Sequence, residues 1–139
     1  MEQRVTAITL GVADLARARR FYEEGLGWRR GNDHPEVVFY QLPGMILSLF
    51  GRDSLAADAK VPAAGSGFSG ISIAHNCRDR AGVDAVLAQA GAAGATILKP
   101  AEDAAWGGYG GYFADPDGHV WEVAWNPDWP LDAAGVPSL

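Results

Sequence analysis

The sequence has little cysteine and little positive charge, and each shortage excludes a class of protein. Its single cysteine, Cys77, cannot close a disulfide within the chain. Lys and Arg together number 11 against 17 Asp and Glu, which gives a net charge of -6. A chain with this balance has no general attraction for a phosphate backbone, so we expect no nucleic-acid partner.

Long apolar runs are missing as well. No stretch approaches the roughly eighteen consecutive apolar residues of a membrane-spanning helix. The opening MEQRV lacks the basic and apolar segments of a signal peptide, so we expect a cytoplasmic protein with no membrane partner. The chain has 139 residues, of which 48% are hydrophobic and 20% charged, and these values are typical of one soluble globular domain.

The first half of the chain predicts a strand, a helix and further strands. Residues 4–12 alternate between apolar and polar side chains, which is the period of a half-buried strand. Asp14 is a favourable N-cap for a helix over residues 15–26, and Gly27 suits its end. Three more strands are predicted, at residues 28–30, 37–42 and 45–50.

The same order of elements begins again at residue 71. Asp79 is the second predicted N-cap, and Gly94 is expected to end the second helix. Strands are predicted at residues 96–99, 109–114 and 119–125. Aligning the two N-caps pairs Ala7 with Ser72, Thr9 with Ala74, Gly11 with Asn76 and Ser48 with Glu122. The second repeat is longer, and we expect its additional residues between positions 100 and 108.

Each repeat has about 55 residues and is too small to bury much core alone, so the two are expected to share an interior. The predicted fold class is α+β, with two tandem βαβββ modules in one pseudo-symmetric, cup-shaped domain over residues 1–127. Its expected parts are a first module at residues 4–53, an Ala-, Gly- and Pro-rich linker at 54–67, a second module at 68–127 and a C-terminal surface tail at 128–139.

A repeated βαβββ unit, FYEEGLGW at the end of the first helix and YFADPDGHVWEVAWNP near the end of the chain carry a family resemblance. Together they resemble the vicinal oxygen chelate superfamily, which contains glyoxalase I, bleomycin-resistance proteins and extradiol dioxygenases. The resemblance covers residues 4–127, and the DPDG turn followed by a strand glutamate is its most specific part. It implies a cup formed by open sheets, and a homodimer.

Members of this superfamily that use a metal bind it through the first and last strands of each module. Carried over to this chain, the resemblance places those positions at Ala7, Ser48, Ser72 and Glu122. Only Glu122 is a strong ligand, whereas catalytic zinc uses three protein ligands and non-haem iron uses two histidines and a carboxylate.

None of the three histidines is expected to supply a missing metal ligand. Strand alternation places His75 and His119 on faces away from Glu122, and His34 falls in a polar loop. We therefore expect no metal site and no cofactor, although a divalent metal remains the family's alternative.

Glu122 has two interpretations that the sequence leaves open. It is either a carboxylate satisfied by hydrogen bonds and water, or a general base or an anchor for a cationic or hydroxyl-bearing ligand. The other polar residues expected to face the cup and bind a ligand are Thr9, Ser48, Ser72 and Asn76.

Aromatic side chains are candidates for the walls of a small-molecule pocket. We assign this role to Phe39, Phe50, Trp106, Tyr109 and Tyr112. The glycines in WGGYGGY do not form a phosphate loop, because no Lys-Ser or Lys-Thr pair and no helix follows them. A flexible strand entry or a bulge is the better interpretation of these glycines.

Three functions remain in competition at this stage. The first is a metal-free, small-molecule-binding homodimer, similar to the antibiotic-sequestering branch of the superfamily. The second is a metal-independent isomerase, epimerase or lyase that uses Glu122 as its base. The third is a metal-dependent glyoxalase or dioxygenase whose ligands lie at other positions. The sequence favours the first, and it does not identify the ligand.

Overall fold

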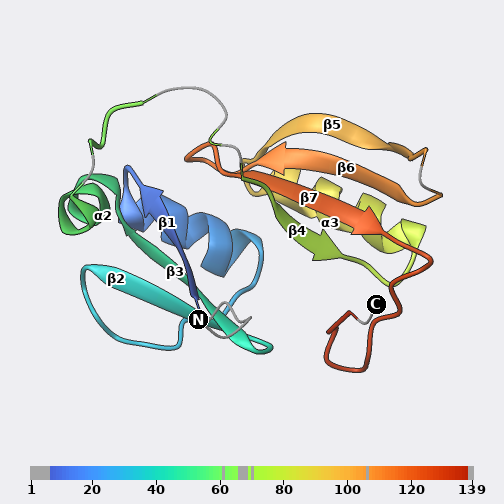
Figure 1. The fold of residues 1–139 in the computed structure, drawn as a ribbon, viewed down its shortest axis with the longest axis horizontal. Helices are drawn as coiled ribbons and strands as arrows, with labels where there is room; N and C mark the ends of the chain where they lie inside the picture. The colour runs from blue at the N-terminus through green and yellow to red at the C-terminus, as the bar shows by residue number, and fades with distance from the viewer. Residues whose placement is uncertain (1–6, 61, 66–68, 70, 106, 138–139) are drawn as a thin grey trace. The chain divides into compact units, whose positions relative to one another are not determined.

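The computed structural model describes residues 7–60, 62–65, 69, 71–105 and 107–137 (Figure 1). The chain forms two compact units, Met1–Ser69 and Gly70–Leu139, and each has its own sheet. Within the described residues, no helix is long and apolar enough to cross a membrane.

The first unit contains a three-stranded sheet in the order β1-β3-β2. Strand β1 runs parallel to β3, and β2 runs antiparallel to it. The elements of this unit are β1 (Ala7–Val12), α1 (Leu15–Arg19), the π-helical turn η1 (Arg20–Gly25), β2 (Val37–Leu42), β3 (Met45–Gly51) and α2 (Arg52–Ala59).

The second unit contains a four-stranded sheet in the order β4-β7-β6-β5. Strand β4 is parallel to β7, and the other neighbours are antiparallel. Helix α3 covers one face of this sheet (Figure 1). The elements of this unit are β4 (Ile73–Asn76), α3 (Arg80–Ala92), β5 (Thr96–Asp103), β6 (Tyr109–Ala114) and β7 (Val120–Trp125).

Both predicted N-caps are confirmed. The Asp14 carboxylate accepts the backbone N–H of Arg17 at 3.0 Å, and the Asp79 carboxylate accepts the backbone N–H of Gly82 at 2.7 Å. Each bond satisfies one of the amide donors that the first turn of a helix leaves without a partner. Gly27 and Gly94 follow the helices with φ of 77° and 102°, as their predicted roles require.

The internal repeat is also confirmed, at the level of strand register. In the parallel pair β1–β3, Thr9 lies opposite Ser48. In the parallel pair β4–β7, Ala74 lies opposite Glu122. The sequence alignment pairs these same positions, so the two modules repeat the parallel pairing of their first and last strands and the register of that pair.

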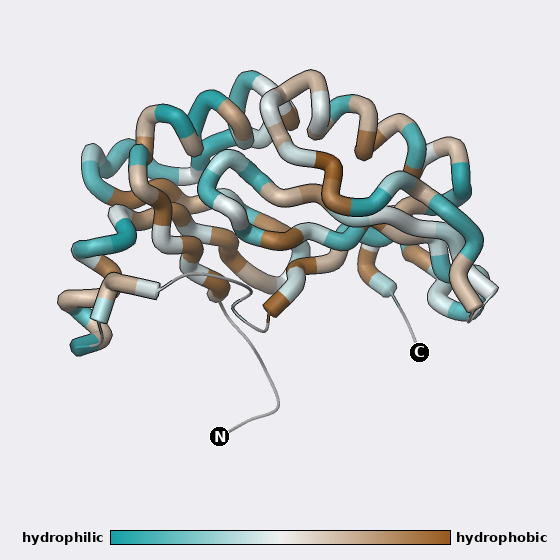
Figure 2. Tube along the Cα trace, turned by 90° about the horizontal axis from the view of Figure 1, so that it is seen from above, coloured by the Kyte–Doolittle hydropathy of each residue, from teal (hydrophilic) through white to brown (hydrophobic). Residues whose placement is uncertain are grey.

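Each unit buries a core between its helix and one face of its sheet. In Figure 2 the helices change repeatedly between hydrophilic and hydrophobic residues along their length, as amphipathic helices do. The first core is rich in aromatic residues, because Tyr22 and Tyr40 are both fully buried and Trp28 packs against them at 5.3 and 5.4 Å between ring centroids. In the second core Phe113 stacks on Trp121 at 6.1 Å.

Four expectations about local structure need correction. Residues 28–30 form no strand, and only Arg30 makes an isolated bridge, to Tyr40. Helix α2 occupies the start of the expected linker, and η1 replaces the second half of the expected first α-helix. Strand β5 continues to Asp103, so part of the additional length of the second module lengthens a strand. Residues 127–137, the described part of the segment after β7, form turns and a bridge between Leu131 and Pro137.

Candidate functional site

A row of polar side chains crosses the second sheet. The register pairs Ala74 with Glu122, Glu122 with Tyr112, and Tyr112 with Lys99, so neighbouring strands bring these four residues side by side. The row lies on the face away from α3, because Gly111, the next residue in β6, is the one whose Cβ would contact Leu87 of that helix.

Glu122, Tyr112 and Lys99 interact electrostatically. Burial raises the pKa of Tyr112, and the interaction of its hydroxyl with the neighbouring Glu122 carboxylate raises that pKa further. The Lys99 ammonium pairs with Glu102 at 2.8 Å, and this bond, with smaller contributions from Tyr112 and Glu122, raises the pKa of Lys99. The row therefore presents a carboxylate, a neutral phenol and a protonated amine within one patch.

These groups offer complementary chemistry to a small molecule. A carboxylate accepts hydrogen bonds or a proton, a phenol donates and accepts, and an ammonium donates to an anion. All three are half-buried in their strands, which leaves part of each side chain accessible. Such a set can orient a polar ligand, and its carboxylate can serve as a base.

In the first unit the equivalent face carries three of the predicted residues in one row. The hydroxyl oxygens of Thr9 and Ser48 lie 2.5 Å apart. Phe39, in β2, is the register partner of Ser48 on the side of β3 away from β1. Ser48 is buried, whereas Phe39 is 40% exposed. Phe50 lies two residues along β3, on the same face as Ser48. These four side chains form a mixed aromatic and hydroxyl surface.

The remaining predicted residues are more scattered. Asn76 ends β4 opposite Ala124 and shares the face of Glu122, while Ser72 is exposed just before that strand. Trp106 lies outside the described residues. The ligand-binding role of all three stays a prediction.

Tyr109 is separated from Tyr112 by the alternation of strand β6. Its hydroxyl donates to Asp84 of α3 at 2.9 Å, and the Arg80 guanidinium lies 4.4 Å from the centre of its ring. Arg80 also pairs with Asp103. Tyr109 thus joins α3 to the end of the β5–β6 hairpin, and its expected contact with a ligand stays a prediction.

The donor chemistry of the described residues does not fit a tightly held transition metal. Ala7 has no donor atom, and the Ser48 hydroxyl is already bonded to Thr9. Among the described residues no three His, Cys, Asp or Glu side chains gather closely enough to hold an ion. His75 lies opposite Val123 in the register, on the other face from Glu122, and exposed His34 accepts a backbone N–H from Glu36.

Sequence reasoning missed Lys99. Its place beside Tyr112 depends on the register of β5 against β6, which shifts on either side of Lys99. Bulges of this kind leave no periodic signal in the sequence. Pro100 follows directly in this edge strand, a position where proline is tolerated, and it is the only local sign of the irregularity.

Comparison with known proteins supports the same fold. A structure described as a glyoxalase-related enzyme from Fulvimarina pelagi shares 41% identity with this chain, covers 99% of it and 98% of its own length, and gives a TM-score of 0.90. A lactoylglutathione lyase from Agrobacterium tumefaciens is 23% identical over 89% of this chain and 94% of its own, with a TM-score of 0.68, which concerns the fold alone. The comparison with curated proteins gives no match.

The family model described as the Glyoxalase/Bleomycin resistance protein/Dioxygenase superfamily matches residues 4–123. That range includes both modules and both N-caps, and it ends one residue after Glu122. The expected resemblance is therefore confirmed, and the chain belongs to the glyoxalase/bleomycin resistance protein/dioxygenase superfamily.

Proposed function

We propose that this protein binds a small organic molecule through the polar row of the second sheet, without a tightly bound transition metal. The observation that carries the proposal is the strand register that sets Glu122, Tyr112 and Lys99 side by side on one face of the sheet. The Glu122 carboxylate lies on the face away from α3, where Ala74 beside it offers no competing polar group.

The row favours a ligand that carries hydrogen-bond donors. Glu122 has more lone pairs than Tyr112 can use, so it can accept from a hydroxyl or an ammonium group of the ligand. Lys99 is exposed enough to contact a ligand anion, although its pair with Glu102 competes for that role. We also propose a homodimer as the working assembly.

The proposal is tested by metal analysis and by thermal-shift measurement on the purified full chain. Less than a tenth of an equivalent of iron, zinc, nickel or manganese, together with unchanged melting after chelator treatment, is expected. One equivalent of a bound transition metal contradicts the metal-free assignment. Size-exclusion chromatography with light scattering tests the homodimer.

Binding is tested with tartrate, glycerate, ethanolamine and choline as probes of hydroxyl and cationic chemistry. A ligand that binds only the folded state raises the melting temperature, because saturation at about 100 times Kd adds about 2.7 kcal/mol of stability. Glu122→Gln should remove the shift, whereas Glu36→Gln, in an exposed loop of the first unit, should retain it. An equal shift in both variants would exclude Glu122 as the anchor.

Acid–base catalysis is the second candidate, favoured by the position of Glu122 beside Tyr112 in the register and by the description of the relative from Fulvimarina pelagi as an enzyme. In that case the Glu122 carboxylate takes a proton from a carbon next to a carbonyl, the electron pair of the broken C–H bond passes into an enolate, and the Glu122 acid returns the proton to that carbon. Proton exchange of 2-hydroxy or 2-oxo acids in deuterated water, followed by NMR, measures this step. Loss of exchange in Glu122→Gln with binding retained supports catalysis, and full exchange in that variant excludes it.

A further inference from the structure

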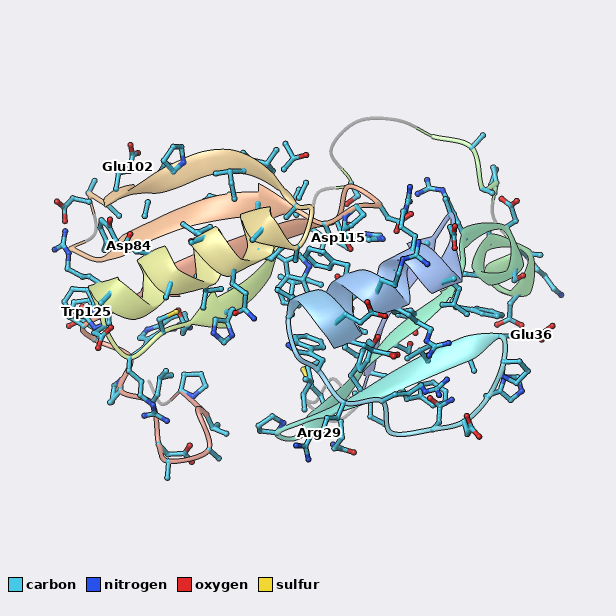
Figure 3. All side chains as sticks on the ribbon, turned by 180° about the vertical axis from the view of Figure 1, so that it is seen from behind. Arg29, Glu36, Asp84, Glu102, Asp115 and Trp125 are labelled. Atoms are coloured by element: carbon cyan, nitrogen blue, oxygen red, sulfur yellow. The ribbon has the colours of Figure 1, made fainter. Side chains whose placement is uncertain are left out.

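The residues that follow β7 form a closed loop fixed to the rest of the second unit. The Arg78 guanidinium donates to the backbone carbonyl oxygens of Leu131, Asp132 and Ala133 at 3.2, 2.6 and 3.3 Å. Leu131 and Pro137 close the loop through a bridge. Figure 3 labels Trp125, the last residue of β7, at the end of the sheet from which this segment departs. The loop therefore makes a defined wall beside the β4–α3 connection.

A cavity of about 280 Å³ lies against this wall, wholly within the second unit. Four residues with flat apolar rings line it, Trp125, Pro127, Trp129 and Pro130, together with the polar residues Arg78 and Asn126. Cys77, which is buried, lines it as well. Its volume is at the lower end for small-molecule sites, so a ligand must be small, and the flat walls favour a planar one.

Arg78 is the one charged residue in the lining. A guanidinium has five N–H donors, of which three are used by the loop carbonyls, so two remain. Within the described part of the chain Arg78 forms no ion pair, and the neighbouring Asp79 carboxylate is occupied as the N-cap of α3. The cavity thus combines planar apolar walls with a cation that has no carboxylate partner there.

We propose that this cavity is a second ligand site, specific for a small planar aromatic carboxylate. The ring of the ligand would pack against the tryptophan and proline residues, and its carboxylate would accept a hydrogen bond from one of the two remaining N–H groups of Arg78, Nε–H or the second Nη1–H. Charge-assisted hydrogen bonds of this kind are about twice as strong as neutral ones, so the carboxylate should dominate the selectivity. The site lies at the end of β7, on residues that the Glu122 row does not use, and does not depend on the function proposed for that row.

The test is a titration of the isotope-labelled full chain with benzoate, followed by heteronuclear NMR. Saturable shifts of the Trp125 and Trp129 indole N–H signals are expected. Benzyl alcohol, a neutral analogue of the same shape, should bind about tenfold more weakly, and inorganic phosphate should cause no indole shifts. Equal binding of benzoate and benzyl alcohol, or shifts confined to residues around Glu122, overturns the proposal.

Two variants and one control locate the binding. Trp129→Ala removes an exposed wall of the cavity and should weaken benzoate binding about tenfold, with the rest of the spectrum unchanged. Arg78→Lys keeps the charge, but the three N–H donors of lysine cannot bond all three loop carbonyls and the ligand together, and a similar loss is expected. Leu98→Ala, an exposed apolar site on β5, should leave binding unaltered. Wild-type affinity for benzoate in both site variants contradicts the proposal. Trp129→Ala keeps the test decisive if Arg78→Lys loosens the loop.

Discussion

Replacing Gly111 by alanine tests how closely β6 must approach its neighbours. A Cβ at this position would lie 2.6 Å from the carbonyl oxygen of Lys99 and 3.0 Å from the backbone nitrogen of Ala101. It would also lie 2.9 Å from a methyl group of Leu87. Two of these atoms belong to the backbone of β5, so a side-chain movement cannot relieve the contact.

The expected cost follows from two opposing effects. Overpacking of a close-packed site costs about 1–3 kcal/mol, because strands or helix must shift. Alanine also lowers the conformational entropy of the unfolded chain relative to glycine, which stabilises the folded protein by roughly 0.4–1 kcal/mol. We therefore expect Gly111→Ala to lower the free energy of unfolding by about 1–2 kcal/mol. No left-handed backbone is involved at Gly111, so the steric effect is isolated from backbone strain.

Urea unfolding followed by tryptophan fluorescence measures this loss, since Trp121 is stacked in the core of the same unit. Gly65→Ala is the matched control, because its Cβ would meet nothing within 4 Å and its φ is not positive. The control should differ from the wild type by less than about 0.5 kcal/mol. Equal unfolding midpoints for the two variants would refute the close approach of β5, β6 and α3.

Three further changes test other parts of the fold. The hydrogen bond from the Arg17 N–H lowers the pKa of Asp14 below its unfolded value of 3.8. The ionised Asp14 carboxylate therefore stabilises the fold above pH 3.8, and this stabilisation is lost as the pH falls. The difference in stability between wild type and Asp14→Asn, measured by urea unfolding, should shrink on acidification. Tyr40→Phe should leave stability unchanged or raise it by up to about 1 kcal/mol in thermal unfolding, because among the described residues the buried hydroxyl has no partner at hydrogen-bond geometry, although the Glu23 carboxylate interacts with it electrostatically. Asp79→Ala should cost about 1 kcal/mol in urea unfolding, and Asp79→Ser should restore most of it.

The repeat and its register could be predicted because they depend on local signals. An aspartate at an N-cap, a glycine after a helix and a period of two in a strand are each visible within a few residues. The alignment of Asp14 with Asp79 then places Ser48 and Glu122 at equivalent positions, and the register confirms this.

Features that depend on tertiary contacts could not be predicted in this way. Residues 28–30 have strand-like composition, but only Arg30 finds a strand partner, in Tyr40. Tyr109 and Tyr112 cannot be told apart from the sequence, yet they lie on opposite faces of β6. Tyr109 contacts Asp84 on α3, and Tyr112 lies beside Glu122. Which face carries the site depends on where α3 packs, and that is set by the whole core.

The asymmetry between the modules indicates why polar chemistry concentrates in the second one. In the first unit Ser48 faces Thr9, and the two hydroxyls, 2.5 Å apart, satisfy each other. At the equivalent position Glu122 faces Ala74, which has neither a hydrogen-bonding group nor much bulk. The carboxylate is therefore held by Tyr112 and keeps acceptor capacity for another molecule. Two differences in a repeated register, Ala74 in place of Thr9 and Glu122 in place of Ser48, thus separate a closed hydroxyl pair from an available acid.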